Sequence, residues 1–308
     1  MKANVPEIDL PRLMQEFGSE EKCRAFMEAL RWPDGIECPR CRSARVSRIK
    51  VRSQFDCDSC RYQFSATAGT IFHDTHLPLW KWFLAVYIMC ESKKGVSALQ
   101  LKRMLGTGYR TAWYLCHRIR EAMANANRLD GKLNHKIIEV DDTQIQGEKR
   151  RWRPKQDRIY VLGMVERHNG RVRFQVIPDL SSETLKKAAL RNIGGNAWLV
   201  ITDELAAYVN ALGPTFKHRY KRIRHKREYV AQDGIVHTNS IENAFSLLKR
   251  GIVGSWHHVS EKHLQRYLDE MSFRFSERRN PRLFSDTIVE LLSADPLTFK
   301  KLTARKVA

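Results

Sequence analysis

The chain has 308 residues and carries 54 Lys and Arg against 34 Asp and Glu, which gives a formal net charge of +20. Its length allows two or three small domains, with a sizeable core in at least one of them. A protein this basic is expected to bind a polyanion, most commonly nucleic acid, although charge alone does not exclude a ribosome-like or membrane-surface protein. No apolar run is long enough to span a bilayer and no basic-then-apolar signal segment opens the chain, so we expect a cytoplasmic protein with no membrane partner.

The first predicted element is a helix over residues 19–31. Ser19 can cap it, and acidic residues occupy its first turn. Apolar residues recur along it at helical spacing: Cys23, Phe26, Met27 and Leu30. The sequence Trp32-Pro33-Asp34-Gly35 ends the helix, and a compact, turn-rich segment follows from Cys38 to about Gly69.

This turn-rich segment contains two CxxC pairs, Cys38-Pro39-Arg40-Cys41 and Cys57-Asp58-Ser59-Cys60. Two such pairs can close a tetrahedral four-thiolate site, which suits one zinc ion. No ligand position is left for water, so the site is predicted to be structural, and metal binding would supply the folding energy of a segment too small for its own core. A redox CxxC pair is the alternative, and the ribbon-like spacing favours zinc. The other cysteines fall on apolar helix faces and are interpreted as core residues: Cys23, Cys90 and Cys116.

A helix-turn-helix is predicted over residues 97–125. A helix begins after Pro78, Ser97 can cap a short second helix, and Gly106-Thr107-Gly108 separates that helix from a longer one that starts at Tyr109. The longer helix offers basic residues to phosphates or base edges: Arg110, His117, Arg118 and Arg120. The alternative is an ordinary helical hairpin packed on a core.

The pattern changes near Lys136 to segments rich in Val and Ile. Strands are predicted over residues 137–145, 159–165, 172–177 and 197–202, with a further strand within 221–230. Helices are predicted over residues 181–192, 238–250 and 260–276, and the last 30 residues or so are expected to form a modest helical tail.

Acidic residues stand at distinctive places in this second half. Asp141 and Asp142 lie inside a predicted strand, where carboxylates are costly unless something binds them, and Asp203 ends another strand. Magnesium prefers carboxylate oxygens, and two such ions can catalyse phosphodiester chemistry. Two alternatives need no metal: Asp203 can start the following helix, and Asn239 with Glu242 has the spacing of a capping box.

Basic residues accompany these carboxylates. Lys249 follows Glu242 by two helical turns, so the two side chains share a helix face, as a metal ligand and a phosphate-binding residue would; a solvated face is the alternative. Basic runs occupy residues 149–158 and 217–227, and phosphate contacts are their natural interpretation. Within the first run we select as DNA-binding residues Arg151, Arg153 and Lys155.

These segments together resemble bacterial and archaeal insertion-sequence transposases with an N-terminal zinc ribbon and a DDE-type catalytic domain, some of which use Asn at the third position. The similarity covers roughly residues 15–280. The front end is similar in "RWPDGIECPRC", "FDCDSCRYQFSATAGTIF" and "GVSALQLKRMLGTGYRTAWYLCHRIREAM". The catalytic part is similar in "IIEVDDTQIQG", "VITDELAAY", "HTNSIENAFSLLKRGIVGSWHHVSEKHLQRYLDE" and "FRFSERRN".

The resemblance implies an RNase-H-like core with Asp141 and Asp203 as the first two catalytic carboxylates. Either Glu242 or Asn239 would be the third catalytic residue, and Lys249 the basic partner. The chain departs from the family at a few positions. Where this chain has Asp142, the family often has Glu, and where it has Gln144 and Gln146, the family often has Gly or a Tyr-rich stretch. Near Phe245 the family often has Trp.

The predicted protein is therefore an α+β, multidomain DNA transposase. Its expected domains are an N-terminal helix and zinc ribbon (1–70), a helix-turn-helix region (71–130), an RNase-H-like mixed sheet with flanking helices (131–280) and a C-terminal helical tail (281–308). It would bind one structural Zn²⁺ and two catalytic Mg²⁺ or Mn²⁺ ions. Its partners would be the terminal inverted repeats and target DNA, held by a homodimer or larger assembly associated with the nucleoid. The alternatives are a non-catalytic zinc-ribbon and helix-turn-helix DNA-binding protein, and an RNase-H-like nuclease such as a junction resolvase.

Overall fold

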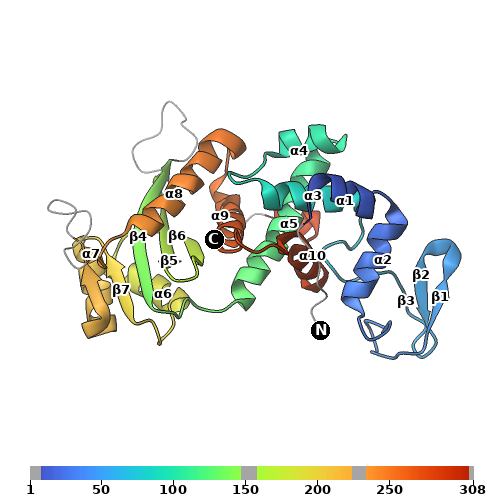
Figure 1. Cartoon of the computed structure of the whole chain (residues 1–308), viewed down its shortest axis with the longest axis horizontal. Helices are drawn as coiled ribbons and strands as arrows, with labels where there is room; N and C mark the ends of the chain where they lie inside the picture. The colour runs from blue at the N-terminus through green and yellow to red at the C-terminus, as the bar shows by residue number, and fades with distance from the viewer. Residues whose placement is uncertain (1–7, 147–157, 224–233, 305–308) are drawn as a thin grey trace. The chain divides into compact units, whose positions relative to one another are not determined.

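The computed structural model describes residues 8–146, 158–223 and 234–304, and these form two compact units (Figure 1). Unit 1 takes in the described residues up to Ser92, residues 96–125, and those from Asn280 onward. Unit 2 takes in residues 93–95 and the described part of 126–279. Among the described residues, no helix combines the length and the apolar character that crossing a lipid bilayer requires.

Unit 1 begins with two short helices, α1 (Leu10–Phe17) and α2 (Glu20–Arg31). Each starts at a side-chain cap: Asp9 accepts a hydrogen bond from the Arg12 amide at 2.8 Å, and Ser19 accepts one from the Lys22 amide at 3.3 Å. Helix α2 confirms the predicted helix, whereas α1 was not predicted. Their apolar faces contribute to an aromatic cluster with α3 and α10: Phe17, Phe26, Phe83 and Phe284.

A three-stranded antiparallel sheet follows α2 in the sequence. Its strands β1 (Val46–Ile49), β2 (Gln54–Cys57) and β3 (Gln63–Phe64) lie in sequence order, with a 3-10 turn between the first two. The buried rings of Phe55 and Phe64 pack against Trp32, which ends α2, and form the small core of this ribbon. So small a core contributes little stability by itself.

The helical part of unit 1 confirms the predicted helix-turn-helix order. Helices α3 (Leu79–Glu91), α4 (Ala98–Leu105) and α5 (Tyr109–Leu129) follow one another, Ser97 caps α4, and Gly106 ends α4 in the left-handed conformation at φ 58°. Two further helices, α10 (Leu283–Ser293) and α11 (Phe299–Thr303), complete the unit. As predicted, Cys23, Cys90 and Cys116 are buried.

Unit 2 is built on a five-stranded sheet of order β6-β5-β4-β7-β8. The strands are β4 (Ile137–Gln146), β5 (Arg158–Glu166), β6 (Val172–Ile177), β7 (Leu199–Thr202) and β8 (Tyr220–Arg222). The first three form an antiparallel meander, and β7 pairs in parallel with β4 on one side and with β8 on the other. Strand β8 begins close to the predicted 221–230, most of which lies outside the described residues.

Helices cover both faces of this sheet (Figure 1). Ile138 and Val140 of β4 pack toward α6 (Ser182–Asn192) and α7 (Ala206–Phe216). Ile145, an odd-numbered residue of the same strand, packs toward α8 (Asn239–Gly251) and α9 (Glu261–Ser276). Because side chains alternate along a strand, β4 is buried on both faces. A mixed sheet of this order between two pairs of helices is the RNase-H-like architecture, so the predicted fold class is confirmed.

Candidate active site

The sheet brings the two expected aspartates to neighbouring positions. Strands β4 and β7 are parallel, with Glu139 paired to Ile201. Continuing this register by two residues places Asp141 level with Asp203, which follows β7 directly. Asp141 is two residues beyond Glu139 in the same strand, so its side chain lies on the sheet face that α8 covers.

Helix α8 carries both candidates for the third site residue, Asn239 and Glu242, in its first turn. Thr238 is its N-cap residue and donates a hydrogen bond from Oγ1 to Oε1 of Glu242 at 2.9 Å. The suggested capping box is therefore wrong in its register, because Asn239 is the first residue inside the helix rather than its cap. Asn239, Glu242 and Lys249 are all exposed.

The carboxylates around Asp141 affect one another electrostatically. Desolvation raises the pKa of Asp141 to about 7, and the negative charges of Asp203, Asp142 and Glu242 add to this effect. Asp203 accepts a hydrogen bond from the Leu205 amide at 3.1 Å. A half-buried carboxylate among other acids is a place where a divalent cation would relieve repulsion.

Asp142 has a different environment from its neighbour. It alternates to the other face of the sheet, where the buried Tyr208 donates its O–H to Asp142 Oδ1 at 2.9 Å. Desolvation raises the pKa of Asp142 even though this hydrogen bond opposes the shift. The side chains of Asp141 and Asp142 therefore point to opposite faces of the sheet.

Glu139 is a buried charge that the sequence analysis did not single out. Its side chain has no exposed surface, and its Oε2 accepts hydrogen bonds from the amides of Ser240 at 2.8 Å and Ile241 at 3.0 Å. Its Oε1 pairs with Arg167 Nε at 2.6 Å. The signal was present in the sequence, because a third acid within a Val- and Ile-rich strand needs a partner as much as the other two do.

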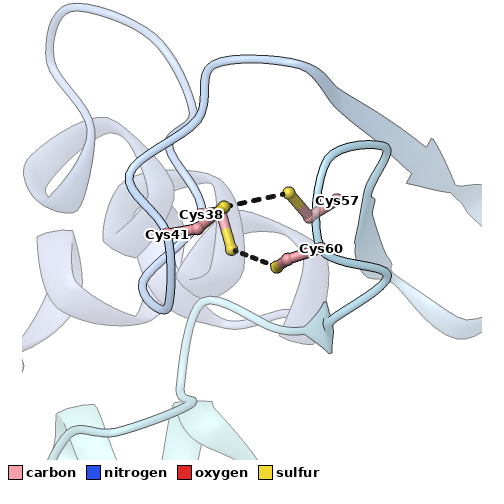
Figure 2. A group of neighbouring side chains, drawn as sticks. All are labelled: Cys38, Cys41, Cys57 and Cys60. Atoms are coloured by element: carbon pink, nitrogen blue, oxygen red, sulfur yellow. Dashed lines mark hydrogen bonds between the residues drawn. The ribbon is translucent and has the colours of Figure 1, made fainter.

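The four cysteines of the two CxxC pairs meet in one cluster (Figure 2). Their sulfur atoms all lie within 4.8 Å of one another, and the Sγ–Sγ distances are 3.6 Å for Cys38–Cys60 and 3.5 Å for Cys41–Cys57. Tetrahedral zinc with bonds of about 2.3 Å needs sulfur atoms about 3.8 Å apart, so the cluster fits that ion. Among the described residues, Asp141, Asp203 and Glu242 form no group this tight, so a cation there would draw them inward or keep water ligands.

Desolvation also acts on the thiols of this cluster. It raises the pKa of Cys60 to about 12, and hydrogen bonds with the neighbouring thiols add to the increase. Four crowded thiols resist ionising together, and a bound divalent cation would remove that resistance.

The two turns that carry these cysteines are built alike. The amide of Arg42 donates to the Cys38 carbonyl and that of Arg61 to the Cys57 carbonyl, both at 2.8 Å. Each arginine directly follows its pair, and their φ angles of 58° and 56° lie in the left-handed region. This repeated geometry points the thiols of both turns toward one centre.

The arginines of α5 that were expected to contact DNA differ in their exposure to solvent. Arg110, at the start of α5, is exposed and lies near the ring of Phe299. Arg118 and Arg120 are buried, with only 4% and 2% of their surfaces exposed, and Arg118 donates to the backbone carbonyls of Ile71 and His73. Direct contact with DNA does not fit this burial. Three further candidates lie outside the described residues: Arg151, Arg153 and Lys155.

The described chain thus combines a four-thiol ribbon, two helices joined by a glycine turn, and an RNase-H-like sheet that carries acidic side chains. Comparison with known families matches residues 129–276 to the ISXO2-like transposase domain and residues 18–63 to the transposase zinc-ribbon domain. In both regions the chain is thus similar to transposases that carry these two domains.

Two further comparisons found similar proteins. The chain is 27% identical over 290 residues, covering 87% of this chain and 95% of the relative, to an uncharacterized protein in transposable element ISH50 of Halobacterium salinarum. The solved structure of the Mos1 strand transfer complex is similar with a TM-score of 0.32 and 11% identity, over 68% of this chain and 75% of that chain.

Proposed function

We propose that this protein is an active DNA transposase that binds the terminal inverted repeats of its element and catalyses metal-dependent strand cleavage and strand transfer. The observation that supports the proposal is the register of β4 and β7, which pairs Glu139 with Ile201, two residues before Asp141 and Asp203 respectively. A divalent cation bound between acids from the two segments would offset their mutual repulsion.

The metal ligands proposed on this face are Asp141, Asp203 and Glu242. Glu242 is preferred to Asn239 because its charge raises the pKa of Asp141, which requires proximity, and because a carboxylate binds magnesium better than an amide does. Two Mg²⁺ or Mn²⁺ ions held here would supply electrostatic stabilisation to a phosphodiester undergoing in-line attack. Lys249, two turns further along α8, is proposed to hold a DNA phosphate.

The remaining parts of the chain are proposed to bring DNA to that site. One zinc ion would hold the four cysteines of the ribbon together. The helix-turn-helix would recognise the end sequences, with Arg110 as its exposed basic residue. Because two element ends must be joined to one target, the active species is proposed to be a dimer or larger assembly.

A non-catalytic DNA-binding protein is the competing function. Such a protein has no use for Asp141, whose pKa is raised to about 7. A carboxylate kept in such surroundings costs stability and is retained where function needs it.

The test is cleavage and joining of a labelled DNA duplex that carries the inverted repeats flanking the gene, with Mg²⁺ or Mn²⁺ present. We expect activity from the full chain and its loss in Asp141→Asn and Asp203→Asn, while DNA affinity stays unchanged. Glu204→Gln, a change at the exposed acid beside Asp203, is the matched control and should retain activity. Equal activity in all variants, or none in the unaltered chain, would reject the proposal in favour of the DNA-binding protein.

A further inference from the structure

The start of α8 is tied to the sheet by an interaction from outside the helix. The first N–H groups of a helix lack partners within it, and a negative charge at that end is favourable. In α8 the cap residue Thr238 makes no side-chain bond to these amides. Glu139 of β4 supplies the acceptor instead, from 101 and 102 residues away in sequence.

The partner of Glu139 fixes the segment that leads into the helix. Arg167 pairs with Glu139 and also donates to the carbonyls of Ile235 at 2.7 Å and His237 at 3.0 Å. His237 Nδ1 lies 3.4 Å from Glu139 Oε1. Both carboxylate oxygens of Glu139 are thus occupied, and residues 235–241 are held by Glu139 together with its partner Arg167.

A close approach fixes the next turn of the helix. Gly163 of β5 is the residue paired with Asp141, and a Cβ atom at this glycine would lie 2.5 Å from Phe245 Cζ and 2.7 Å from Ile241 Cδ1. The absence of a side chain lets α8 lie directly over the strand pair that carries Asp141. Helix α8 is therefore located by a hydrogen-bonded contact at its first turn and a packing contact at its second.

We infer that Glu139 is a positioning residue that sets the distance between Glu242 and the aspartates of the sheet. It lies two residues before Asp141 on the same face of β4, so one strand carries both a proposed metal ligand and the anchor of the helix that brings another. The inference rests on the proposed function. Supporting groups of this kind typically change metal affinity or activity by about 10- to 100-fold.

Glu166 offers a matched control. Like Glu139 it is a fully buried carboxylate that accepts two backbone hydrogen bonds, from Asn134 at 2.7 Å and His135 at 2.5 Å. Arg171 lies beside it at 3.8 Å. It binds no part of α8, so Glu166→Gln measures the general cost of removing a buried charge from this sheet.

The experiment compares Glu139→Gln and Glu166→Gln in the full chain. Binding of Mn²⁺ alone is titrated by the electron paramagnetic resonance signal of the free ion, and backbone hydrogen exchange is followed over residues 239–245. We expect Glu139→Gln to weaken Mn²⁺ binding about tenfold or more and to speed exchange at Ser240 and Ile241. Glu166→Gln should leave both readouts near those of the unaltered chain.

A second arm tests whether the effect passes through Glu242. In a Glu242→Gln background, Glu139→Gln should cause no further loss of Mn²⁺ affinity, although it should still speed exchange at the helix start. If Glu139→Gln does not fold, Glu139→Asp keeps the charge against Arg167, withdraws it from the helix amides, and should give the same two changes.

Three results would overturn the inference. They are equal losses in the Glu139 and Glu166 variants, an undiminished loss in the Glu242→Gln background, or unchanged exchange at the helix start. Failure of the proposed function has a different signature, since Asp141→Asn would then bind Mn²⁺ as the unaltered chain does.

Discussion

Asp141 allows a prediction in which activity and stability change in opposite directions. Its pKa is raised from 3.8 to about 7 in the folded chain, chiefly by desolvation and then by the charges of Asp203, Asp142 and Glu242. A carboxyl group with a raised folded pKa stabilises the fold at low pH, and this contribution disappears as the pH rises through the folded pKa. The metal-free protein should therefore carry its largest penalty from Asp141 above about pH 7.

The size of this penalty follows from the shift. About three pKa units correspond to about 4 kcal/mol, and partial solvation of the site reduces this to about 2–4 kcal/mol. Asp141→Asn removes the charge and keeps Oδ1, which accepts the Asp142 amide hydrogen bond at 2.8 Å. We expect this variant to be inactive, yet to melt about 5–15 °C higher than the unaltered chain in chelator at pH 8.

The assay is thermal unfolding of both proteins from pH 4 to pH 8.5, with chelator and with Mg²⁺. The difference should be small at pH 4, grow through pH 7, and shrink when Mg²⁺ stabilises only the unaltered chain. Asp179→Asn is the control, because hydrogen bonds from Ser181 lower the pKa of this exposed carboxyl, so its removal should not stabilise the protein. A lower melting temperature for Asp141→Asn at pH 8, or a difference that ignores pH, would refute the reasoning.

The other predictions concern the front end of the chain. Cys60→Ser should release zinc and unfold the ribbon while the melting of unit 2 is unchanged; ordered ribbon signals in zinc-free protein would contradict this. Arg110→Ala should weaken DNA binding and lower the slope of log affinity against log salt by about one, whereas an unchanged slope would remove this residue from the interface. Arg42→Gly and Arg61→Gly should each make the ribbon as stable or up to about 1 kcal/mol more stable, because glycine adopts the left-handed conformation without strain; faster zinc loss to chelator would argue otherwise.

Local patterns in the sequence were sufficient for much of the fold. Strands β4 to β7 and most helices were predicted because their apolar periods and caps are encoded within a few residues, as at Ser97 and Ser181. The zinc cluster was predictable for the same reason, since each CxxC turn is a local structure. Helix α1 was missed, although Asp9 and Pro11 mark its start.

Long-range contacts were harder to predict. Arg118 and Arg120 were assigned to DNA because of their charge, but each lies one turn from a buried apolar residue, Leu115 and Cys116 respectively, so the helical period puts them in the interior. The burial of an acid at Glu139 could have been noticed, but its partners could not be predicted, because they are the amides of Ser240 and Ile241, and backbone groups so distant in sequence leave no motif.

The alternation along β4 has a consequence for how errors in strand pairing would be tolerated. A slip of one residue moves every side chain to the opposite face. Because Asp141 and Asp142 are adjacent and both acidic, the slipped strand would still present one carboxylate toward α8 and another toward Tyr208. Glu139 has no such substitute: the slip would bury its charge among the aliphatic side chains under α6 and α7, without Arg167 or the helix amides. An unpaired buried carboxylate costs several kcal/mol. Glu139 therefore makes the observed pairing of β4 far more stable than the pairing shifted by one residue.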